Sequence, residues 1–329
     1  MQAGLAVDTD LIAALADGEF HSGEALGSAL GMSRAAVWKR IGQLADAGVD
    51  IERVRGRGYR VAGGIRLLDG AEISRRLENK MAVQLLTATG STNADALVKL
   101  AAGAPAPFAL LAEYQSAGRG RRGRRWASPF ASNLYVSVGW RFRVGAPRLE
   151  GLSLAVGIVV AESLIVTAGL GDKVKLKWPN DVWVDGRKIA GVLIELSGDL
   201  EDACAAVIGI GINGRLGDLA AAEIEQPWTD LYRETGKTPD RSLLAADLLE
   251  RLHLMLKVFP DQGFDGFRER WHKLDGLQGK RVRLSTASGA MAGLVQGVDG
   301  SGALKLLGDD GQTRLFHGGE VSLRPSADA

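Results

Sequence analysis

The segment Glu113–Trp126 reads Glu-Tyr-Gln-Ser-Ala-Gly-Arg-Gly-Arg-Arg-Gly-Arg-Arg-Trp, with five arginines and three glycines between Gly118 and Arg125. We call Gly118–Arg125 the Gly/Arg loop. Glycine lets backbone N–H groups approach a ligand closely, and arginine supplies a planar, permanently charged fork for phosphate or carboxylate. The loop is therefore suited to wrap an anion. It predicts enzyme chemistry on a phosphorylated or carboxylated small molecule.

Two other interpretations compete for this loop. Its glycine spacing, Gly118-x-Gly120-x-x-Gly123, matches the dinucleotide-binding fingerprint, which needs a helix at the glycines and an acidic residue about 20 positions later. The residues after Arg125 show no helical period, and Val138–Arg143 contains no Asp or Glu, so we exclude that interpretation. A solvated basic loop that touches nucleic acid fits equally well, and the loop alone does not separate it from a small-anion site.

The composition of the 329-residue chain is that of a soluble globular protein, with 46% hydrophobic and 24% charged residues. The length allows two or three domains. Because the net charge is only +1, a nucleic-acid role needs a local basic patch. The single cysteine, Cys204, excludes a disulfide framework, and we expect a small buried filler before a strand. The four histidines are scattered, which argues against a built-in transition-metal site.

The location of the protein is predicted from two stretches. The amino-terminal residues lack the basic start of a signal peptide. The most apolar run, Leu152–Leu170, is interrupted by Glu162 and small residues, which favours a buried helix over a membrane span. We therefore expect a cytoplasmic protein.

Residues 1–63 contain three short periodic segments, each after a residue that can cap a helix and before a glycine. The expected helices are 9–17 (capped by Thr9), Ser22–Leu30 and 34–47 (capped by Ser33). In the third helix an apolar face is opposed by an exposed stripe that contains Ala35, Lys39 and Gln43. Helix, turn and helix with a polar outer face predict a helix-turn-helix fold.

A basic hairpin follows these helices. Ile51–Val54 and Tyr59–Val61 are β-like and are joined by Arg55-Gly-Arg-Gly58. Residues 34–60 hold seven Lys/Arg against three Asp/Glu. A protein-interaction or dimerisation domain is the alternative, but a basic wing beside the third helix favours DNA. The expected DNA contacts are Ser33, Arg34, Ala35, Trp38, Lys39, Gln43, Arg55 and Arg57.

From about residue 65 to 274, β-like and helical segments alternate. The cluster Thr89-Gly-Ser-Thr-Asn93 lies between a strand and a helix, where a simple N-cap explains it. The elements expected here are strands at Val83–Leu86, Phe108–Tyr114 and Asn133–Trp140 and a helix at Ala94–Ala102.

Lys175–Asp181 (Lys-Leu-Lys-Trp-Pro-Asn-Asp) ends in a turn, and Val182–Val184 and Arg187–Leu196 then form a hairpin around Asp185-Gly186. Lys188 enters the second strand, which holds it rigidly. The alternative is an edge-strand lysine that discourages aggregation.

Ile208–Asn213 reads Ile-Gly-Ile-Gly-Ile-Asn, so one face of this strand is bare at Gly209 and Gly211. Such glycines indicate either close approach of a ligand or close packing. Asn213 at the strand end is suited to hydrogen-bond a base. After residue 274, five short strands separated by turn residues predict a small barrel. They are expected at Arg281–Leu284, Met291–Val298, Ala303–Leu307, Thr313–Phe316 and Glu320–Leu323.

Five motifs, in this order and spacing, resemble those of the biotin protein ligases. They are Gly-Ser-Thr-Asn at 90–93, Glu-Tyr-Gln-x-Ala-Gly-Arg-Gly-Arg-Arg-Gly at 113–123, Lys-Trp-Pro-Asn-Asp at 177–181, Arg-Lys-x-Ala-Gly at 187–191 and Gly-x-Gly-Ile-Asn at 209–213. The front domain adds Gly-Glu-Phe-His-Ser-Gly-Glu at 18–24 and Gly-Met-Ser-Arg-Ala-Ala at 31–36. The chain thus resembles the bifunctional bacterial members, which join a ligase to a biotin operon repressor, over nearly all of its length.

The resemblance implies an α+β protein of three domains. A winged helix-turn-helix domain (1–63) is followed by a mixed-sheet catalytic domain related to class II aminoacyl-tRNA synthetases (64–274) and an SH3-like barrel (275–329). It also implies a two-step reaction. The carboxylate of biotin attacks the α-phosphorus of ATP with Mg²⁺, giving biotinyl-5′-adenylate. A lysine of the biotin carboxyl carrier protein of acetyl-CoA carboxylase then takes the biotinyl group and expels AMP. The adenylate is expected to act also as corepressor on operator DNA, with the chain as a homodimer.

The resemblance implies roles for single residues as well. The catalytic residues are expected to be Lys188, Arg121 and Arg119. Residues expected to bind biotin are Ser91, Thr92, Asn93, Gln115, Gly118, Arg119, Gly120, Arg121 and Lys188. Residues expected to bind ATP or the adenylate are Arg121, Arg124, Trp126, Lys177, Asn180, Asp181, Asn213, Trp228, Glu320 and Arg324. No built-in metal is expected; Mg²⁺ enters with ATP, and Asp181 is a candidate ligand.

The implied roles agree with the chemistry, because positive charge must offset the repulsion between two anions. A Gly-rich loop that closes over ligand also excludes water from a mixed anhydride that hydrolyses readily. Two alternatives stay open: a ligand-sensing repressor without catalysis, and a ligase for lipoate. Trp38 and Lys39 differ from the best-known members, so the operator sequence is not implied.

Overall fold

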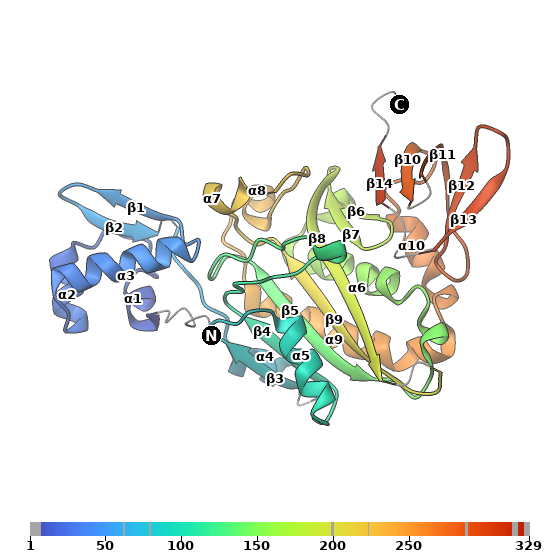
Figure 1. Cartoon of the computed structure of the whole chain (residues 1–329). Coiled ribbons are helices and arrows are strands. Elements are labelled where there is room, and N and C mark those ends of the chain that lie inside the picture. Colours follow the sequence, from blue (N-terminus) through green and yellow to red (C-terminus); the bar gives the residue numbers. More distant parts are fainter. Residues whose placement is uncertain are drawn as a thin grey trace.

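The structure is a computed structural model that describes residues 8–61, 63–78, 80–198, 201–222, 224–286, 289–317 and 322–325. Within these residues the strands form three separate sheets, of two, seven and five strands. The two-stranded sheet lies at one end of the molecule, the seven-stranded sheet in the middle and the five-stranded sheet at the other end (Figure 1).

The amino-terminal part is a winged helix-turn-helix. Its elements are α1 (Thr9–Ala14), α2 (Gly23–Leu30), α3 (Arg34–Asp46), β1 (Ile51–Val54) and β2 (Gly58–Val61). Ser22 and Ser33 cap α2 and α3 as predicted. The cap predicted for α1 is wrong, because Asp8 is the N-cap residue and its carboxylate accepts from Leu11 N at 3.1 Å. This helix also stops at Ala14, three residues earlier than predicted.

Phe130 of the central part belongs to the core of the helix-turn-helix. It is 1% exposed and lies in the same apolar cluster as Val37 and Ile41. Its backbone N–H donates to Ala47 O at 2.9 Å. The sequence leaves the orientation of the DNA-binding domain open, and this contact fixes it in the structure.

The central sheet has the strand order β3-β4-β5-β9-β8-β7-β6, and only the β3–β4 pair is parallel. Its strands are β3 (Ala82–Leu86), β4 (Phe108–Ala112), β5 (Leu134–Arg141), β6 (Val174–Lys177), β7 (Asp181–Val184), β8 (Arg187–Gly198) and β9 (Cys204–Ile212). The predicted primed turn is confirmed between β7 and β8, since Asp185 and Gly186 have φ of 48° and 76°. Cys204 begins β9 rather than preceding it, and it is buried there as predicted.

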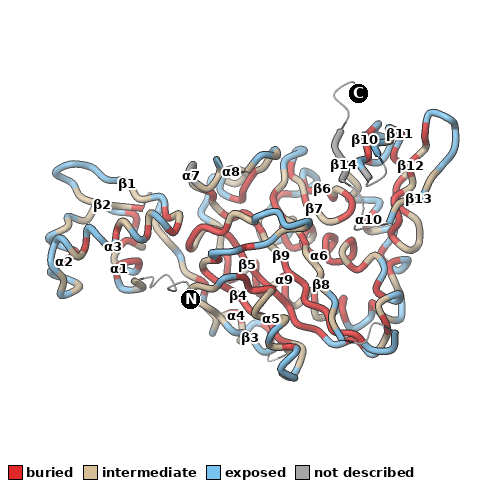
Figure 2. Tube along the Cα trace, in the orientation of Figure 1, coloured by how far each residue is buried: buried red, intermediate tan, exposed pale blue. Residues whose placement is uncertain are grey.

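Both faces of this sheet are covered. Alternate residues of β4 face opposite sides, so Phe108 and Leu110 join the apolar cluster of α5 (Thr92–Ala101), while Ala109 and Leu111 join the large core with α6 (Leu152–Ala168). The large core also contains residues of α4 (Gly70–Arg76), α9 (Arg241–Gln262) and α10 (Arg268–Leu274). Figure 2 shows the buried residues concentrated in the central strands and the helices packed on them.

α6 is a buried core helix, as predicted. In the described chain, the stretch Ala146–Ala168 is long and apolar enough to cross a membrane, and 61% of its apolar window is buried inside the structure. Core helices of soluble proteins pass the same test, so this stretch is weak evidence for a membrane.

The remaining short elements connect these parts. They are α7 (Asp218–Ala221), α8 (Leu231–Thr235) and the 3-10 turns Arg121–Gly123, Ala146–Leu149, Gly171–Lys173 and Asp265–Phe267. The five predicted carboxy-terminal strands form one antiparallel sheet in the order β13-β12-β11-β10-β14. They are β10 (Arg281–Thr286), β11 (Gly289–Val298), β12 (Leu304–Gly308), β13 (Thr313–Phe316) and β14 (Ser322–Pro325). Glu320, predicted to begin the last strand, lies outside the described residues.

Candidate active site

A cavity of about 160 Å³ lies against the central sheet, between the Gly/Arg loop and strands β5, β8 and β9. Most residues that the sequence predicts for biotin and ATP line it. They are Ser91, Thr92, Asn93, Gln115, Arg119, Gly120, Arg121, Arg124, Trp126, Lys177, Asn180, Asp181 and Lys188. The tertiary structure thus brings residues of all five motifs to one cavity.

The Gly/Arg loop forms a tight hairpin. Gly120 N donates to Arg124 O at 2.7 Å, and Trp126 N donates to Gly118 O at 2.9 Å. Gly118, at the start of the loop, is buried, and a Cβ on it would lie only 2.5 Å from Ser128 Oγ. Gly118 therefore shapes the loop and is not part of the cavity lining, although the sequence predicts it to bind biotin.

One end of the cavity is a buried hydrogen-bonded cluster around Gln115. Its Oε1 accepts from Thr92 N at 2.9 Å and from Thr92 Oγ1 at 3.1 Å, and its Nε2 donates to Ser128 Oγ at 3.1 Å. Gln115 and Thr92 are 8% and 3% exposed. Because several buried donors and acceptors meet here, this end is suited to a small polar group of a ligand.

A second set of hydrogen bonds runs from this end to Glu195. Ser137 Oγ donates to Asn93 Oδ1 at 2.6 Å, and Asn93 Nδ2 donates to Glu195 Oε2 at 2.8 Å. Arg119 Nη2 lies 3.4 Å from the same carboxylate oxygen. Ser137 and Glu195 were missed in the sequence, where their only signal is a polar residue within a largely apolar strand.

The bare strand face at Gly209 and Gly211 makes room for neighbouring side chains, and both glycines also line the cavity. A Cβ on Gly209 would lie 2.1 Å from Asn93 Oδ1, and one on Gly211 would lie 2.4 Å from the Trp126 ring. The two glycines thus admit side chains that themselves line the cavity. Trp126 Nε1 is buried and has no hydrogen-bond partner among the described residues, so it is a donor left for a ligand.

Lys188 lies inside the cavity on a central strand. β8 is paired with β9 on one side and β7 on the other, so the edge-strand interpretation of this lysine is wrong. Its Nζ is 2.6 Å from Asp181 Oδ1 and 5.4 Å from the centre of the Trp126 ring. The backbone of Lys188 is held on both sides, by Trp183 of β7 and by residues 227–229.

Arg121 faces Asn180 across the cavity, with its Nη1 2.9 Å from Asn180 Oδ1. Asn180 is itself held, because its Nδ2 donates to Val192 O at 2.9 Å. Burial, and then the neighbouring charge of Arg122, lower the pKa of Arg121, and Asp181 offsets part of this effect. A half-buried guanidinium interacts more strongly with an incoming anion than a solvated one.

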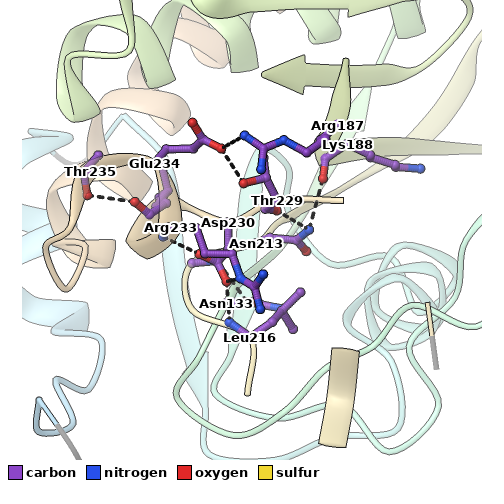
Figure 3. A network of polar contacts seen from close by, with 12 residues as sticks. Asn133, Arg187, Lys188, Asn213, Leu216, Thr229, Asp230, Arg233, Glu234 and Thr235 are labelled. Atoms are coloured by element: carbon purple, nitrogen blue, oxygen red, sulfur yellow. Dashed lines mark hydrogen bonds and ion pairs between the residues drawn. The ribbon is translucent and has the colours of Figure 1, made fainter. Parts of the chain in front are cut away.

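Residues 226–231 lie beside the cavity and are hydrogen-bonded to Lys188 through the backbone. Figure 3 shows the neighbouring side chains, with Asn213 between Lys188 and Thr229 and Glu234 between Arg187 and Thr229. Lys188 N donates to Pro227 O at 3.0 Å, and Thr229 N donates to Lys188 O at 2.9 Å. Glu234 accepts from Arg187 at 2.8 Å and from the Thr229 hydroxyl. Gln226, absent from the sequence predictions, lines the cavity at this point.

Two predicted nucleotide contacts differ in this structure. Asn213 is 5% exposed and donates to Thr229 O at 3.0 Å, so it fastens residues 226–231 rather than lining the cavity. Trp228 packs against Arg233, whose guanidinium carbon is 4.3 Å from the ring centre, and it is not part of the lining. Glu320 and the side chain of Arg324 lie outside the described residues.

All eight predicted DNA contacts are exposed on the helix-turn-helix. Trp38 of α3 is 62% exposed, although large apolar side chains are usually buried. On the wing, the guanidinium carbon of Arg57 lies 4.1 Å from the centre of the Phe20 ring, which holds this arginine in place.

Comparison with known proteins agrees with this arrangement. Residues 87–213 match the family model for the biotin/lipoate A/B protein ligase family, residues 9–60 an HTH domain, and residues 278–324 the biotin protein ligase C terminal domain. The chain is 45% identical to the bifunctional ligase/repressor BirA of Escherichia coli (strain K12), over 97% of each chain. It is 35% identical to the biotin–[acetyl-CoA-carboxylase] ligase of Paracoccus denitrificans, over 71% of this chain and 100% of that one.

A solved structure shares the fold. The biotin protein ligase from Aquifex aeolicus in complex with biotin and ATP matches with a TM-score of 0.63 and 31% identity, over 74% of this chain and 99% of that chain.

Proposed function

Because the chain belongs to the bifunctional ligase/repressor members of the biotin protein ligase family, it is a biotin–protein ligase with a DNA-binding domain, and we propose here how its residues carry out both roles. We place the domain boundaries near residues 63 and 274. The observation that carries the proposal is one cavity in which Lys188, Lys177 and the loop arginines face a buried polar end.

We assign the polar end to the head group of biotin. Ser91, Thr92 and Gln115 supply donors and acceptors for it, and Asn93 is held by Glu195. Lys188 then binds the biotin carboxylate. The carboxylate oxygen attacks the α-phosphorus of ATP, and pyrophosphate leaves with the electrons of the broken P–O bond. In the second step the ε-amine of a carrier lysine attacks the acyl carbon, loses a proton and expels AMP.

The positively charged side chains of the cavity bind the phosphates of ATP. Arg119, Arg121, Arg124 and Lys177 offset the repulsion between the two anions and the charge that develops at phosphorus. The indole N–H of Trp126 is a free donor for the nucleotide. Trp228, which the resemblance implies for ATP or the adenylate, packs against Arg233, so we propose that the Trp126 ring lies beside the adenine instead.

Mg²⁺ is proposed to enter with ATP. Asp181 is the only carboxylate that lines the cavity in the described residues, and one carboxylate together with substrate phosphates is the usual protein site for this ion. When bound, the ion neutralises phosphate charge. Asp181 is held at 2.6 Å by Lys188, so both groups are already positioned at the reacting centre.

The activity is tested by mass spectrometry of an apo biotin carboxyl carrier domain incubated with the chain, ATP and biotin. One biotinyl increment on a single lysine is expected. The absence of an increment would indicate a ligand-sensing repressor without ligase activity. An increment with lipoate in place of biotin would identify a lipoate ligase.

The Gly/Arg loop is predicted to become ordered on ligand binding. A few backbone hydrogen bonds hold its hairpin, and most of its arginines are exposed. Without ligand, amides of Gly118–Arg125 should therefore exchange rapidly, and biotinyl-adenylate should slow them. Amide hydrogen exchange with and without the adenylate measures this. Equal protection in both states would show a preformed loop.

Lys39→Ala combined with Arg57→Ala is predicted to abolish operator binding and to leave biotin transfer unchanged. Lys39 is exposed on the third helix and Arg57 on the wing, and neither lines the cavity. Each lost contact to a DNA phosphate weakens binding of the protein to DNA, whatever the base sequence. Operator titration measures the effect. Lys273→Ala with Arg281→Ala, which removes the same charges elsewhere, is the matched control and should bind normally.

We propose that the protein is cytoplasmic.

We propose that the adenylate acts as corepressor by strengthening a homodimer. One helix-turn-helix offers few basic contacts, and two on a palindrome supply more. Operator affinity should rise with biotin and ATP and fall again when apo carrier is added. Equal affinity with and without the adenylate would contradict the proposed sensing role.

A further inference from the structure

Trp178 connects the cavity to the carboxy-terminal domain. It follows β6 and is 2% exposed, and its Nε1 donates to Gly302 O at 2.9 Å. The two residues are 124 positions apart in the chain. An indole N–H buried with a backbone carbonyl from another domain is a specific contact, because each group loses its water partner on burial.

The carbonyl that accepts from Trp178 belongs to a structured loop, residues 299–303. Asp299 Oδ1 accepts from Ser301 N at 2.9 Å, Ser301 Oγ at 2.8 Å and Ala303 N at 2.9 Å. Burial raises the pKa of Asp299, but these hydrogen bonds outweigh it, so the pKa is lowered. Gly302 has a φ of 86°, and a Cβ on it would lie 3.1 Å from Gly151 Cα. The loop is thus held in one conformation by its own hydrogen bonds, and it packs closely against Gly151.

A second contact joins the same two parts of the chain. Gly276 N donates to Leu176 O at 2.8 Å, and Asp275 pairs with Leu176 in a parallel bridge. β6 is therefore attached to the start of the carboxy-terminal domain just before Trp178 is attached to its loop. Figure 1 shows β6 on the side of the central sheet next to that domain.

The turn after Trp178 carries groups that face the cavity. Trp178, Pro179, Asn180 and Asp181 all line it. Asn180 accepts from Arg121 at 2.9 Å, and Asp181 pairs with Lys188 at 2.6 Å. A shift of Trp178 would displace these two side chains, since each is within three residues of it.

We propose that Trp178 is a positioning residue through which the carboxy-terminal domain holds the nucleotide side of the active site. Its bond to Gly302 fixes the turn that presents Asn180 and Asp181. Gln115 and Thr92, at the opposite end of the cavity, do not depend on this turn for their hydrogen bonds. The proposal rests on the proposed function, which assigns Asn180 and Asp181 to ATP and Gln115 and Thr92 to biotin.

The test is Trp178→Phe in the full chain, which removes the N–H and keeps an aromatic ring. Initial rates of pyrophosphate release are measured against ATP at saturating biotin and against biotin at saturating ATP. We expect the KM for ATP to rise about three- to tenfold, the range that one buried hydrogen bond supports, with the KM for biotin unchanged. Equal changes in both constants, or a lowered Tm with neither constant changed, would overturn the proposal.

Trp271→Phe is the matched control. Trp271 is 1% exposed, but its Nε1 has no hydrogen-bond partner in the described part of the chain. The Trp271→Phe variant also removes a buried indole N–H, but this N–H donates no hydrogen bond to the protein in the described residues. Both KM values should therefore stay at the wild-type level. An ATP-specific rise in this variant as well would show that the effect comes from generally loosened packing.

Two variants of Asp299 test the loop itself. Asp299→Ala removes the acceptor of three hydrogen bonds and should reproduce the ATP-specific rise, whereas Asp299→Asn keeps an oxygen at that place and should restore the wild-type KM. If neither variant differs from wild type, the loop does not act on the site. Wild-type protein that releases no pyrophosphate with biotin and ATP would instead contradict the proposed function.

Discussion

Lys188→Ala is expected to bind ATP but to transfer biotin more slowly by about 2–4 kcal/mol in transition-state stabilisation, which is roughly 30- to 900-fold in rate. The backbone of Lys188 is held on both sides, by Trp183 of β7 and by residues 227–229, and its Nζ is 2.6 Å from Asp181. Removal leaves both the biotin carboxylate and Asp181 without their cation. A cation fixed before the reaction requires little reorganisation, which is why its loss acts mainly on the rate.

Single-turnover formation of the adenylate and its transfer to the carrier domain would measure the two steps separately. Lys175→Ala is the matched control, because Lys175 lies on β6 of the same sheet and is not part of the cavity lining. The control should react at the wild-type rate. Wild-type transfer by Lys188→Ala would assign Lys188 to structure alone.

Arg241→Leu is expected to lower the free energy of unfolding by about 3–5 kcal/mol, the usual cost of leaving a buried charge without its partner. The side chains of Arg241 and Glu113 are 3% and 4% exposed, and Nη1 of Arg241 lies 2.7 Å from Glu113 Oε2. The guanidinium also donates to Asn133 O at 3.0 Å and to Arg66 O at 2.6 Å. The Arg241 side chain therefore contacts three parts of the chain. These are the residues before and after the Gly/Arg loop, Glu113 and Asn133, and Arg66 in the linker from the DNA-binding domain.

Denaturant unfolding of Arg241→Leu, Glu113→Leu and the double variant measures this coupling. The double variant should lose less stability than the sum of the two single variants, because no buried charge is left alone in it. Lys273→Ala, which breaks an exposed pair with Glu269, should leave the transition unchanged. Additive losses would show that Arg241 and Glu113 stabilise the fold independently.

Local patterns of residue types predict the elements of the fold with few errors. The wing, the hairpin at Asp185-Gly186 and the five carboxy-terminal strands are found where periodicity and turn residues predict them. These features depend on neighbouring residues, so a local pattern is enough to specify them. The cap of α1 was predicted one residue too late, because the sequence holds two cap residues in a row, Asp8 and Thr9, and the local pattern does not show that Asp8 is the N-cap.

The candidate site was predicted mainly from motifs, and thirteen of its expected residues line one cavity. Residues whose role depends on distant partners were missed or misplaced. Glu195 enters the site through Asn93, 102 positions away, and Arg119, 76 positions away. Asn213 directly follows β9, which lines the cavity, but its side chain donates to Thr229 O. The Trp126 ring packs against Gly211 of the same strand.

The sequence by itself determined the types of residue that the chemistry needs and the short-range structure that carries them. Only the tertiary structure decided that Lys188 lies on an interior strand, that Phe130 completes the core of the DNA-binding domain and that Trp178 meets Gly302. The reason is physical. Strand order and domain contacts are set by pairing and burial between segments up to 175 residues apart, and no local pattern of residue types records which distant segment will be the partner.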